Sequence, residues 1–414
     1  MPLQSLTTSL SVLALSVGLA QAQDLQSASV LEFADADTLF VADSMAGAIH
    51  AIALPEAGTA PAAPAPYNLL DLDGVLAEAL GADVRGFTYH DLAVHPVTRD
   101  AYISLTATID GVAQPAVVTV TREGAVQRLD LSVLSTDIFT LQDAADDGIT
   151  FWRDIPAASF TVTDLDFANG ELFISGLSTG EFASTLRRVP FPFAGAANAT
   201  GIEIYHAAHG QTETRAPIRA MTVLDLDGVS TVVAAYTCTP LVTIPTADLT
   251  DGANISGRTI AELGYGNTPL EVLDFQVMDR QGNAATYVLV INREMDADLI
   301  SLGDLTTAAS APGITEPIPY LGATVGVATT PLPLSGVLQA ADQDAQFLLT
   351  LRRNLDTGAM DLVSFRKGAY LRLSEFVSEY NFPDYEYADN QSAEGTRMFQ
   401  NMLKGDEGFP DLMR

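Results

Sequence analysis

The stretch LEVLDFQVMDR (residues 270–280), with ATYVLVINRE (285–294), ADLISLGDL (297–305) and TEPIPY (315–320) after it, decides the fold. It has the pattern of short apolar strands joined by tight polar turns. A similar unit stands near the start of the chain, as SVLEFADAD (29–37), TLFVADS (38–44), GAIHAIALP (47–55) and APYNLLDLDG (65–74). The two stretches predict a four-stranded unit that recurs along the chain.

Six such units are expected. Their innermost strands begin near Val30, Asp91, Phe160, Ala220, Leu270 and Gly336. Second strands are expected at residues 39–43, 101–106, 172–175, 230–236, 286–292 and 346–352. Third strands are expected to begin at Ala48, Ala116, Thr185, Leu241, Asp298 and Met360, and fourth strands near Tyr67, Val126, Ile202, Arg258, Ile314 and Tyr370. The spacing of about 50 to 70 residues is of the order that signals propellers.

The predicted fold is therefore all-β, a six-bladed β-propeller over residues 29–376. Long helical periodicity is absent from this part of the sequence. A seven-bladed propeller remains the alternative, because residues 140–156 or 306–333 have room for another unit.

The beginning of the chain has the pattern of a targeting segment. Residues 10–20 are an apolar run of signal-peptide length, and a small-x-small cleavage pattern follows at residues 20–22. The segment departs from the usual pattern, because no Lys or Arg precedes the apolar run. We expect residues 1–22 to be a signal peptide, the mature chain to start near Gln23, and the protein to be periplasmic or secreted.

The end of the chain differs from the repeats. Residues 377–414 are expected to form a tail with a short helix, which Ser392 caps and Gly405 ends. No stretch after the signal reaches about 18 uninterrupted apolar residues, so no transmembrane segment is expected in the mature chain.

The charge of the chain excludes one class of partner. The 414 residues include 52 Asp and Glu against 20 Lys and Arg, which gives a formal charge of −32. Such a surface repels nucleic acid, because phosphate binding needs a basic footprint. Cys238 is the single cysteine, so no disulfide can form within the chain.

The rhythm DLAVHPVTRDAYISL (residues 91–105), an apolar strand, a turn and a second strand, resembles the NHL/gluconolactonase-like and YVTN-like propellers. The resemblance covers most of residues 30–376 and implies the architecture alone. Calcium lactonases of that group use a set of Glu, Asn and Asp ligands on inner strands. That set does not map onto this sequence, and no catalytic residue is carried over.

In a propeller, the loop that enters each innermost strand and the loop between the second and third strands open on one face. The predicted units place several scarce arginines in these loops. Arginine presents a planar fork that suits carboxylate or phosphate. We therefore predict a ligand site at the mouth of the central channel, for an anionic small molecule or a protein partner. The alternative is that the arginines pair with nearby acidic residues. The predicted ligand-binding residues are Arg153, Arg215, Arg219, Asn267, Arg293 and Arg353.

Two segments of the same loop class indicate a metal site. YHAAHGQTETRAPIR (residues 205–219) contains His206 and His209, and AYTCTPLV (235–242) contains Cys238. Two imidazoles and a thiolate suit zinc or copper. His90 is a candidate fourth ligand from across the mouth. The alternative is a buried structural cysteine beside a turn that contains histidines.

Calcium is the less favoured metal. Three Asp-x-Asp pairs carry the carboxylates that calcium prefers, at Asp35 and Asp37, Asp71 and Asp73, and Asp225 and Asp227. Aspartates at hairpin turns normally accept hydrogen bonds from their own backbone, and no complete calcium-binding loop is present.

Two classes of function stay open from the sequence. The first is an exported propeller that acts as a binding or assembly module. The second is a metal-dependent enzyme, or a subunit of a redox enzyme, with a His/Cys site at the mouth. No motif identifies a reaction, so the catalytic residues are unknown at this stage.

Overall fold

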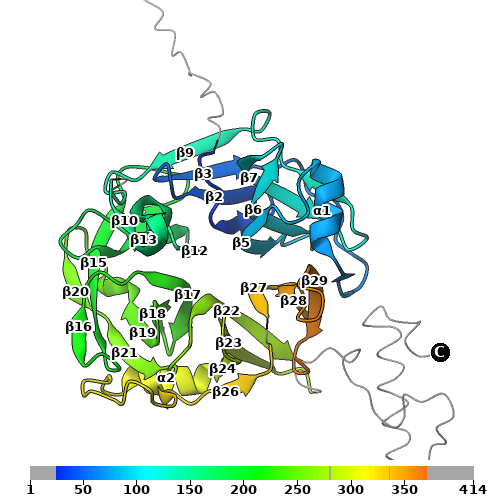
Figure 1. Cartoon of the computed structure of the whole chain (residues 1–414). Coiled ribbons are helices and arrows are strands. Elements are labelled where there is room, and N and C mark those ends of the chain that lie inside the picture. The colour runs from blue at the N-terminus through cyan, green and yellow to red at the C-terminus, as the bar shows by residue number, and fades with distance from the viewer. Residues whose placement is uncertain (1–24, 147, 279–280, 335, 371–414) are drawn as a thin grey trace, which may run out of the picture.

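The structure is a computed structural model that describes residues 25–146, 148–278, 281–334 and 336–370. Antiparallel sheets stand around a central opening in a β-propeller arrangement (Figure 1). Six sheets of the described residues have four or more strands. The all-β prediction is confirmed.

The first strand of each large sheet lies beside the central opening (Figure 1). These strands are β1 (Leu31–Asp35), β5 (Phe87–Val94), β12 (Asp164–Ala168), β17 (Ile218–Leu226), β22 (Pro269–Met278) and β27 (Val337–Asp342). The second strands are β2 (Thr38–Asp43), β6 (Ala101–Ile109), β13 (Glu171–Leu177), β18 (Val229–Tyr236), β23 (Ala284–Asn292) and β28 (Phe347–Arg353). The third strands are β3 (Ala48–Ala53), β7 (Val112–Val120), β14 (Ser184–Pro190), β19 (Pro240–Pro245), β24 (Ala297–Ser301) and β29 (Met360–Arg366). All three sets lie within a few residues of their predicted positions.

The outer strands differ from the prediction in three sheets. They are β9 (Thr136–Thr140), β8 (Val126–Arg128), β15 (Asn198–His206), β21 (Arg258–Glu262), β26 (Thr330–Leu332) and β4 (Asn68–Leu69). The strand expected near Tyr67 is β4, but it pairs with β29 and completes the last sheet, while β9 completes the first. Among the described residues no strand lies near Ile314 or at Tyr370, and β26 and β4 are the outer strands of those two sheets.

The order of sheets around the ring differs from their order in the chain. The first strands contact each other in the order β1, β12, β17, β22, β27, β5 and back to β1. The sheet that contains β5 therefore lies between the last sheet and the first one. After β3 the chain adds β4 to the sheet built on β27, and it then forms the sheet built on β5. It returns to the first sheet with β9.

The two long insertions hold no further four-stranded sheet among the described residues. Residues 140–156 contain β10 (Thr150–Phe151), the 3₁₀ turn η1 (Trp152–Asp154) and β11 (Ile155–Pro156), and η2 (Ala157–Phe160) follows. Residues 306–333 contain most of α2 (Leu302–Ser310), β25 (Val325–Gly326) and β26. The shorter elements β16 (Gln211–Glu213) and β20 (Asn254–Ser256) flank β15, and η3 (Thr246–Asp248) follows β19.

Two short helices are found where strands or turns were predicted from the sequence. α1 (Leu72–Leu80) starts where the Asp71 side chain accepts a hydrogen bond from Gly74 N, and it ends at Gly81 in a left-handed conformation. α2 starts at Ser301, whose hydroxyl accepts from Asp304 N. The strand expected to continue through residues 302–305 therefore ends at this cap.

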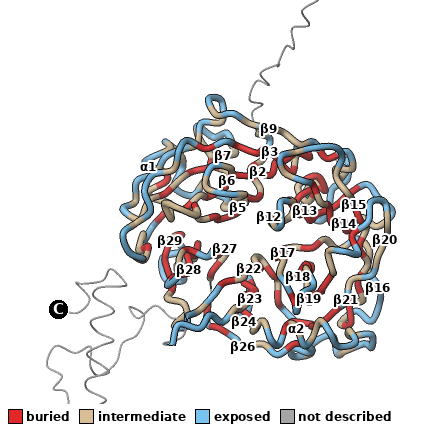
Figure 2. The backbone as a smooth tube through the Cα atoms, turned by 180° about the vertical axis from the view of Figure 1, so that it is seen from behind, coloured by how far each residue is buried: buried red, intermediate tan, exposed pale blue. Residues whose placement is uncertain are grey.

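The core lies between neighbouring sheets, where the middle strands are buried (Figure 2). Every residue from Leu39 to Asp43 in β2 is buried, as is every residue of β3 except Ala53. Both faces of such a strand are covered, which explains why these strands are apolar runs without strict alternation.

The predicted signal peptide (residues 1–22) and the predicted C-terminal tail with its helix (residues 377–414) lie outside the described residues. Within the described part of the chain, no helix has the length and apolar character needed to cross a bilayer.

Candidate functional site

The register of the sheets places the entry loops and the loops between second and third strands at one end of the ring. The start of each first strand pairs with the end of the second strand, as in Leu31 with Val41 and Ile218 with Tyr236. The same register joins Pro269 to Asn292. Residues in these two classes of loop therefore share the end from which the predicted site residues come.

The structure brings three of the four predicted metal ligands together. His206 ends β15, His209 lies in the turn before β16, and Cys238 lies between β18 and β19. One ligand atom from each residue lies within 4.8 Å of the other two. The donors come from neighbouring sheets, one built on β12 and the other on β17.

The local chain path explains why the two imidazoles meet. His209 N donates to His206 O at 3.1 Å, and Gly210 N donates to Ala207 O at 3.1 Å, so the chain reverses between β15 and β16. Gly210 has a φ of 64°, which glycine adopts without strain. The centroids of the two imidazole rings are 3.8 Å apart.

Glu213 on β16 orients both imidazoles. Its Oε2 accepts from His206 Nδ1 at 3.0 Å, and its Oε1 accepts from His209 Nδ1 at 2.6 Å. Gln211 Nε2 also donates to Oε1, at 3.1 Å. A metal-binding histidine commonly donates its other ring N–H to a carboxylate. Both Nδ1 atoms are engaged in this way, so Nε2 is the ring atom for a ligand in each case, although His206 Nε2 must first leave its contact with Thr239 Oγ1.

A second carboxylate lies beneath the first imidazole. Glu262 on β21 is fully buried, and its Oε1 accepts from Ala207 N at 2.6 Å. The Thr239 hydroxyl donates to its Oε2 and lies 3.2 Å from His206 Nε2. Glu262 Oε2 is 3.9 Å from that same nitrogen. The floor of the site is therefore negatively charged and fully hydrogen-bonded.

The electrostatics of the site depend on these carboxylates. Burial acts to raise the pKa of Glu213, but the hydrogen bonds from His209, His206 and Gln211 outweigh it and lower that pKa. Burial raises the pKa of the Cys238 thiol, and the charges of Glu262 and Glu213 add to the increase. A bound cation would reverse the second effect, because metal coordination deprotonates a thiol.

The backbone of Cys238 is in the left-handed region, with φ of 82°. Only glycine, and sometimes Asn or Asp, adopts this region routinely. Strained residues of this kind concentrate at functional sites.

His90, the fourth predicted ligand, lies outside this group. It is on β5, and its Nε2 is 2.8 Å from Thr106 Oγ1. Burial lowers its pKa. It lines the central channel instead, with Ser159 and Arg219.

The predicted ligand-binding residues have different surroundings. Burial lowers the pKa of the Arg219 guanidinium, and the charge of Arg293 lowers it further. Arg153 lies 4.2 Å from the ring of the exposed Trp152. Arg353 Nη1 donates to Gly358 O at 2.7 Å.

The other two residues of this prediction are unlike each other. Arg215 is exposed, in the stretch between β16 and β17. Asn267 is buried, and its side-chain nitrogen donates to Leu263 O. Its Oδ1 is buried and has no hydrogen-bond partner among the described residues.

The acidic lining of the central channel was not predicted from the sequence. A cavity of about 300 Å³ is bounded by residues of all six first strands. Its carboxylates are Glu32, Asp91, Asp164, Asp166, Glu271, Asp274 and Asp342. The sequence held a signal for them, because acids stand within mostly apolar first strands, such as Glu271 and Asp274 in β22.

The channel carboxylates bind their protons more tightly than usual. Burial raises the pKa of Asp91 and of Asp166 to about 6. Burial also raises the pKa values of Glu32, Asp164 and Glu271, and the other channel carboxylates add to these increases. Arg219 is near Asp164, and Lys367 pairs with Asp342 at 2.6 Å.

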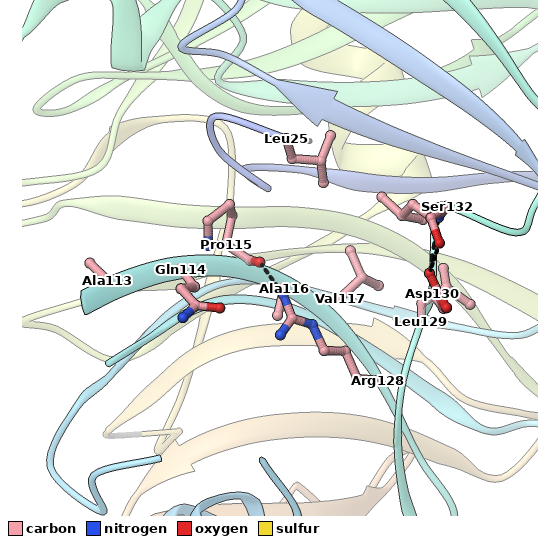
Figure 3. A pocket seen from close by; sticks show the side chains of 11 residues that line it. Leu25, Ala113, Gln114, Pro115, Ala116, Val117, Arg128, Leu129, Asp130 and Ser132 are labelled. Atoms are coloured by element: carbon pink, nitrogen blue, oxygen red, sulfur yellow. Dashed lines mark hydrogen bonds between the residues drawn. The ribbon is translucent and has the colours of Figure 1, made fainter. Parts of the chain in front are cut away.

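A larger cavity, of about 630 Å³, lies away from the channel, beside residues 113–117 of β7 (Figure 3). Leu25, Pro115 and Arg128 are among its lining residues, and Arg128 Nη2 donates to Pro115 O at 3.3 Å. None of the predicted site residues lines this cavity.

Comparisons with known proteins identify no family. No family model and no curated protein matches the chain. Among solved structures, extracellular domains 1–2 of Drosophila semaphorin 1b match with 10% identity and a TM-score of 0.36, over 84% of this chain and 86% of that one. A glucose dehydrogenase matches with 11% identity and a TM-score of 0.32, over 83% and 98%. YCF48 bound to D1 peptide matches with 9% identity and a TM-score of 0.28, over 80% and 78%. These values carry no argument about function, and they do not single out the NHL or YVTN-like propellers.

Proposed function

We propose that the protein is an exported, six-bladed propeller whose channel end binds a transition metal through His206, His209 and Cys238. The observation that carries this proposal is the convergence of two imidazoles and a thiol within 4.8 Å. In this proposal each of the six large sheets is one blade, and the metal joins two neighbouring blades.

The donor set selects the class of metal. Imidazole and thiolate suit zinc and copper, whereas calcium takes oxygen ligands. Bound to one zinc ion, at about 2.0 to 2.3 Å from it, the donors would lie about 3.5 Å apart. The donor atoms lie within 4.8 Å of one another, so a closure of at most about 1.3 Å, within the reach of side-chain rotation, is needed.

Metal binding is tested with the purified exported protein after dialysis against a chelator. Zinc is then titrated in competition with a chromophoric chelator. We expect one zinc per chain, and a His206→Ala/His209→Ala double variant that has lost it. His90→Gln is the matched control, because this histidine is outside the group, and it should bind as the wild type does. Equal zinc affinity in the double variant and the wild type would refute the metal site.

A second candidate is an anionic ligand at the channel mouth, from a small molecule or a protein partner. The observation that favours it is the effect of the Arg293 charge on the buried Arg219 guanidinium, since an anion that binds between two such cations would relieve their repulsion. Binding of a dicarboxylate probe, followed by calorimetry, should weaken in Arg293→Gln and with rising salt. Binding that is indifferent to both changes would exclude this ligand class.

Export has its own test. N-terminal sequencing of the protein recovered from the periplasm or medium should start at Gln23 or within a few residues. An intact Met1 on protein confined to the cytoplasm would show that residues 1–22 are not a signal peptide.

A further inference from the structure

The proposed metal site offers three strong donors, and its carboxylates are already engaged. Glu213 accepts hydrogen bonds from both imidazoles, at 2.6 and 3.0 Å. Glu262 accepts from the Ala207 amide and from the Thr239 hydroxyl. A carboxylate that accepts from ligand N–H groups orients those ligands around the metal. The donor set that remains is two imidazole nitrogens and one sulfur.

This donor set differs from the usual structural zinc site. Structural zinc almost always has four protein ligands in a closed tetrahedron. Among the described residues the group has three members, His206, His209 and Cys238. Two histidines and one cysteine are the donors of trigonal copper sites that transfer electrons. Copper(II) also exceeds zinc in affinity for a given set of nitrogen and sulfur donors.

The burial of the three donors is graded from the inside outward. The His206 side chain is 1% exposed, whereas the His209 side chain is 35% exposed. Cys238 is half-buried between these extremes. His209 also stacks on Tyr320, with ring centroids 6.0 Å apart and an interplanar angle of 20°. The metal would therefore be shielded by protein on one side and would reach the surface through an exposed imidazole.

We propose that the site holds copper as a copper(II)–thiolate centre that exchanges one electron with a soluble donor through the His209 edge. This inference rests on the proposed metal site. On binding, the Cys238 thiol gives its proton to solvent and the sulfur coordinates Cu(II). Cu(II) then takes one electron from an external one-electron reductant, which is oxidised by one electron, and becomes Cu(I). No bond to a substrate forms, and the centre returns to Cu(II) when an acceptor removes that electron.

The test uses the full exported chain, freed of metal and titrated with copper(II) without oxygen. We expect one copper per chain and an intense visible band from charge transfer between thiolate and copper. Ascorbate should bleach the band, and ferricyanide should restore it. Cys238→Ser should keep weaker copper binding through the imidazoles and lose the intense band. Glu123→Gln, an exposed acid away from the group, serves as the unaffected control.

The outcomes separate this inference from the proposed function. One bound metal without the thiolate band, or a band that cannot be cycled, overturns the copper centre and leaves the metal site standing. Copper(II) that is consumed with permanent loss of the free thiol also overturns it. Failure to bind either zinc or copper removes both the metal site and the copper centre.

Discussion

At the scale of the residue, Cys238 combines an unfavourable backbone with a favourable donor position. A side chain at a φ of 82° costs roughly 1 kcal/mol relative to glycine, because Cβ crowds the following carbonyl. Its sulfur meanwhile lies within 4.8 Å of two imidazole ligand atoms. Strain at this position is explained if the thiol is needed as a ligand.

Because of this strain, replacing Cys238 by glycine should increase stability and weaken metal binding. Cys238→Gly should raise the unfolding free energy of the metal-free protein by about 1 kcal/mol, because glycine adopts this conformation freely. The same variant should bind zinc or copper more weakly. Denaturant unfolding in chelator, with a parallel metal titration, measures both. Cys238→Ala is the control that loses the sulfur and keeps the strain, and it should show only the loss of binding.

Glu213 is the second residue whose role is testable. Because one carboxylate positions both imidazoles, Glu213→Gln should weaken metal affinity by roughly 10- to 100-fold, the usual cost of losing such a partner. The thiolate donor is untouched, so the variant should still bind one metal per chain. An affinity equal to that of the wild type in a competition titration would show that the imidazoles are held by other contacts. Glu123→Gln, in the exposed turn between β7 and β8, again provides the acidic control.

At the scale of the element, the ring is closed by very short strands. β4 has two residues and pairs Asn68 and Leu69 with β29. Next to it the buried Tyr67 hydroxyl accepts from Ala101 N at 3.0 Å and lies 3.0 Å from Val120 O. Tyr67 N donates to Ser364 Oγ at 2.7 Å. One aromatic side chain therefore ties the last sheet to the sheet built on β5.

Removing that hydroxyl should weaken the closure. Tyr67→Phe leaves buried backbone groups without a partner, at a cost of about 1–3 kcal/mol in unfolding free energy. Tyr265→Phe, at a side chain that is 55% exposed, should change stability little. Both are compared by denaturant unfolding at one pH. Equal stability of the two variants would mean that the Tyr67 hydroxyl contributes nothing to ring closure.

The same short elements mark the limit of what the sequence predicts. The middle strands were predictable because burial on both faces makes them long apolar runs, as in β2 and β23. β4 and β26 have two and three residues, too few for a pattern, and their sheet is decided by ring closure. The sequence likewise did not predict that β4 joins a different sheet from β3, because no local pattern encodes which sheet a strand joins.

The candidate site also has a part that the repeat predicted and a part that it did not. The grouping of His206, His209 and Cys238 followed from loop class, because the repeat itself says which loops share an end. The orienting role of Glu213 depends on the turn between β15 and β16, which the repeat does not describe. His90 shares the predicted loop class but lies on β5, and its ring meets Thr106 instead.

At the scale of the whole molecule, the channel gathers like charges from separate sheets. Glu32, Asp91, Asp164 and Glu271 come from four different first strands, and each is far from the others in sequence. Only the closed ring brings them together. Their raised pKa values are therefore a property of the assembled propeller, absent from the unfolded chain.

This difference sets the pH dependence of stability. The pKa of Asp91 rises from an ordinary 3.8 to about 6 on folding, so between these values the folded state binds more protons than the unfolded chain. The unfolding free energy should consequently fall as the pH rises from 4 to 6, by at least about 1 kcal/mol. Glu271→Gln removes one of the acids whose pKa is raised on folding, and it keeps an oxygen that can accept from Val272 N. It should flatten this fall and raise stability at neutral pH. Glu123→Gln, on an exposed turn, should leave the pH profile of stability unchanged. A wild-type unfolding free energy that increases from pH 4 to pH 6 would show that the channel acids are not the groups that titrate.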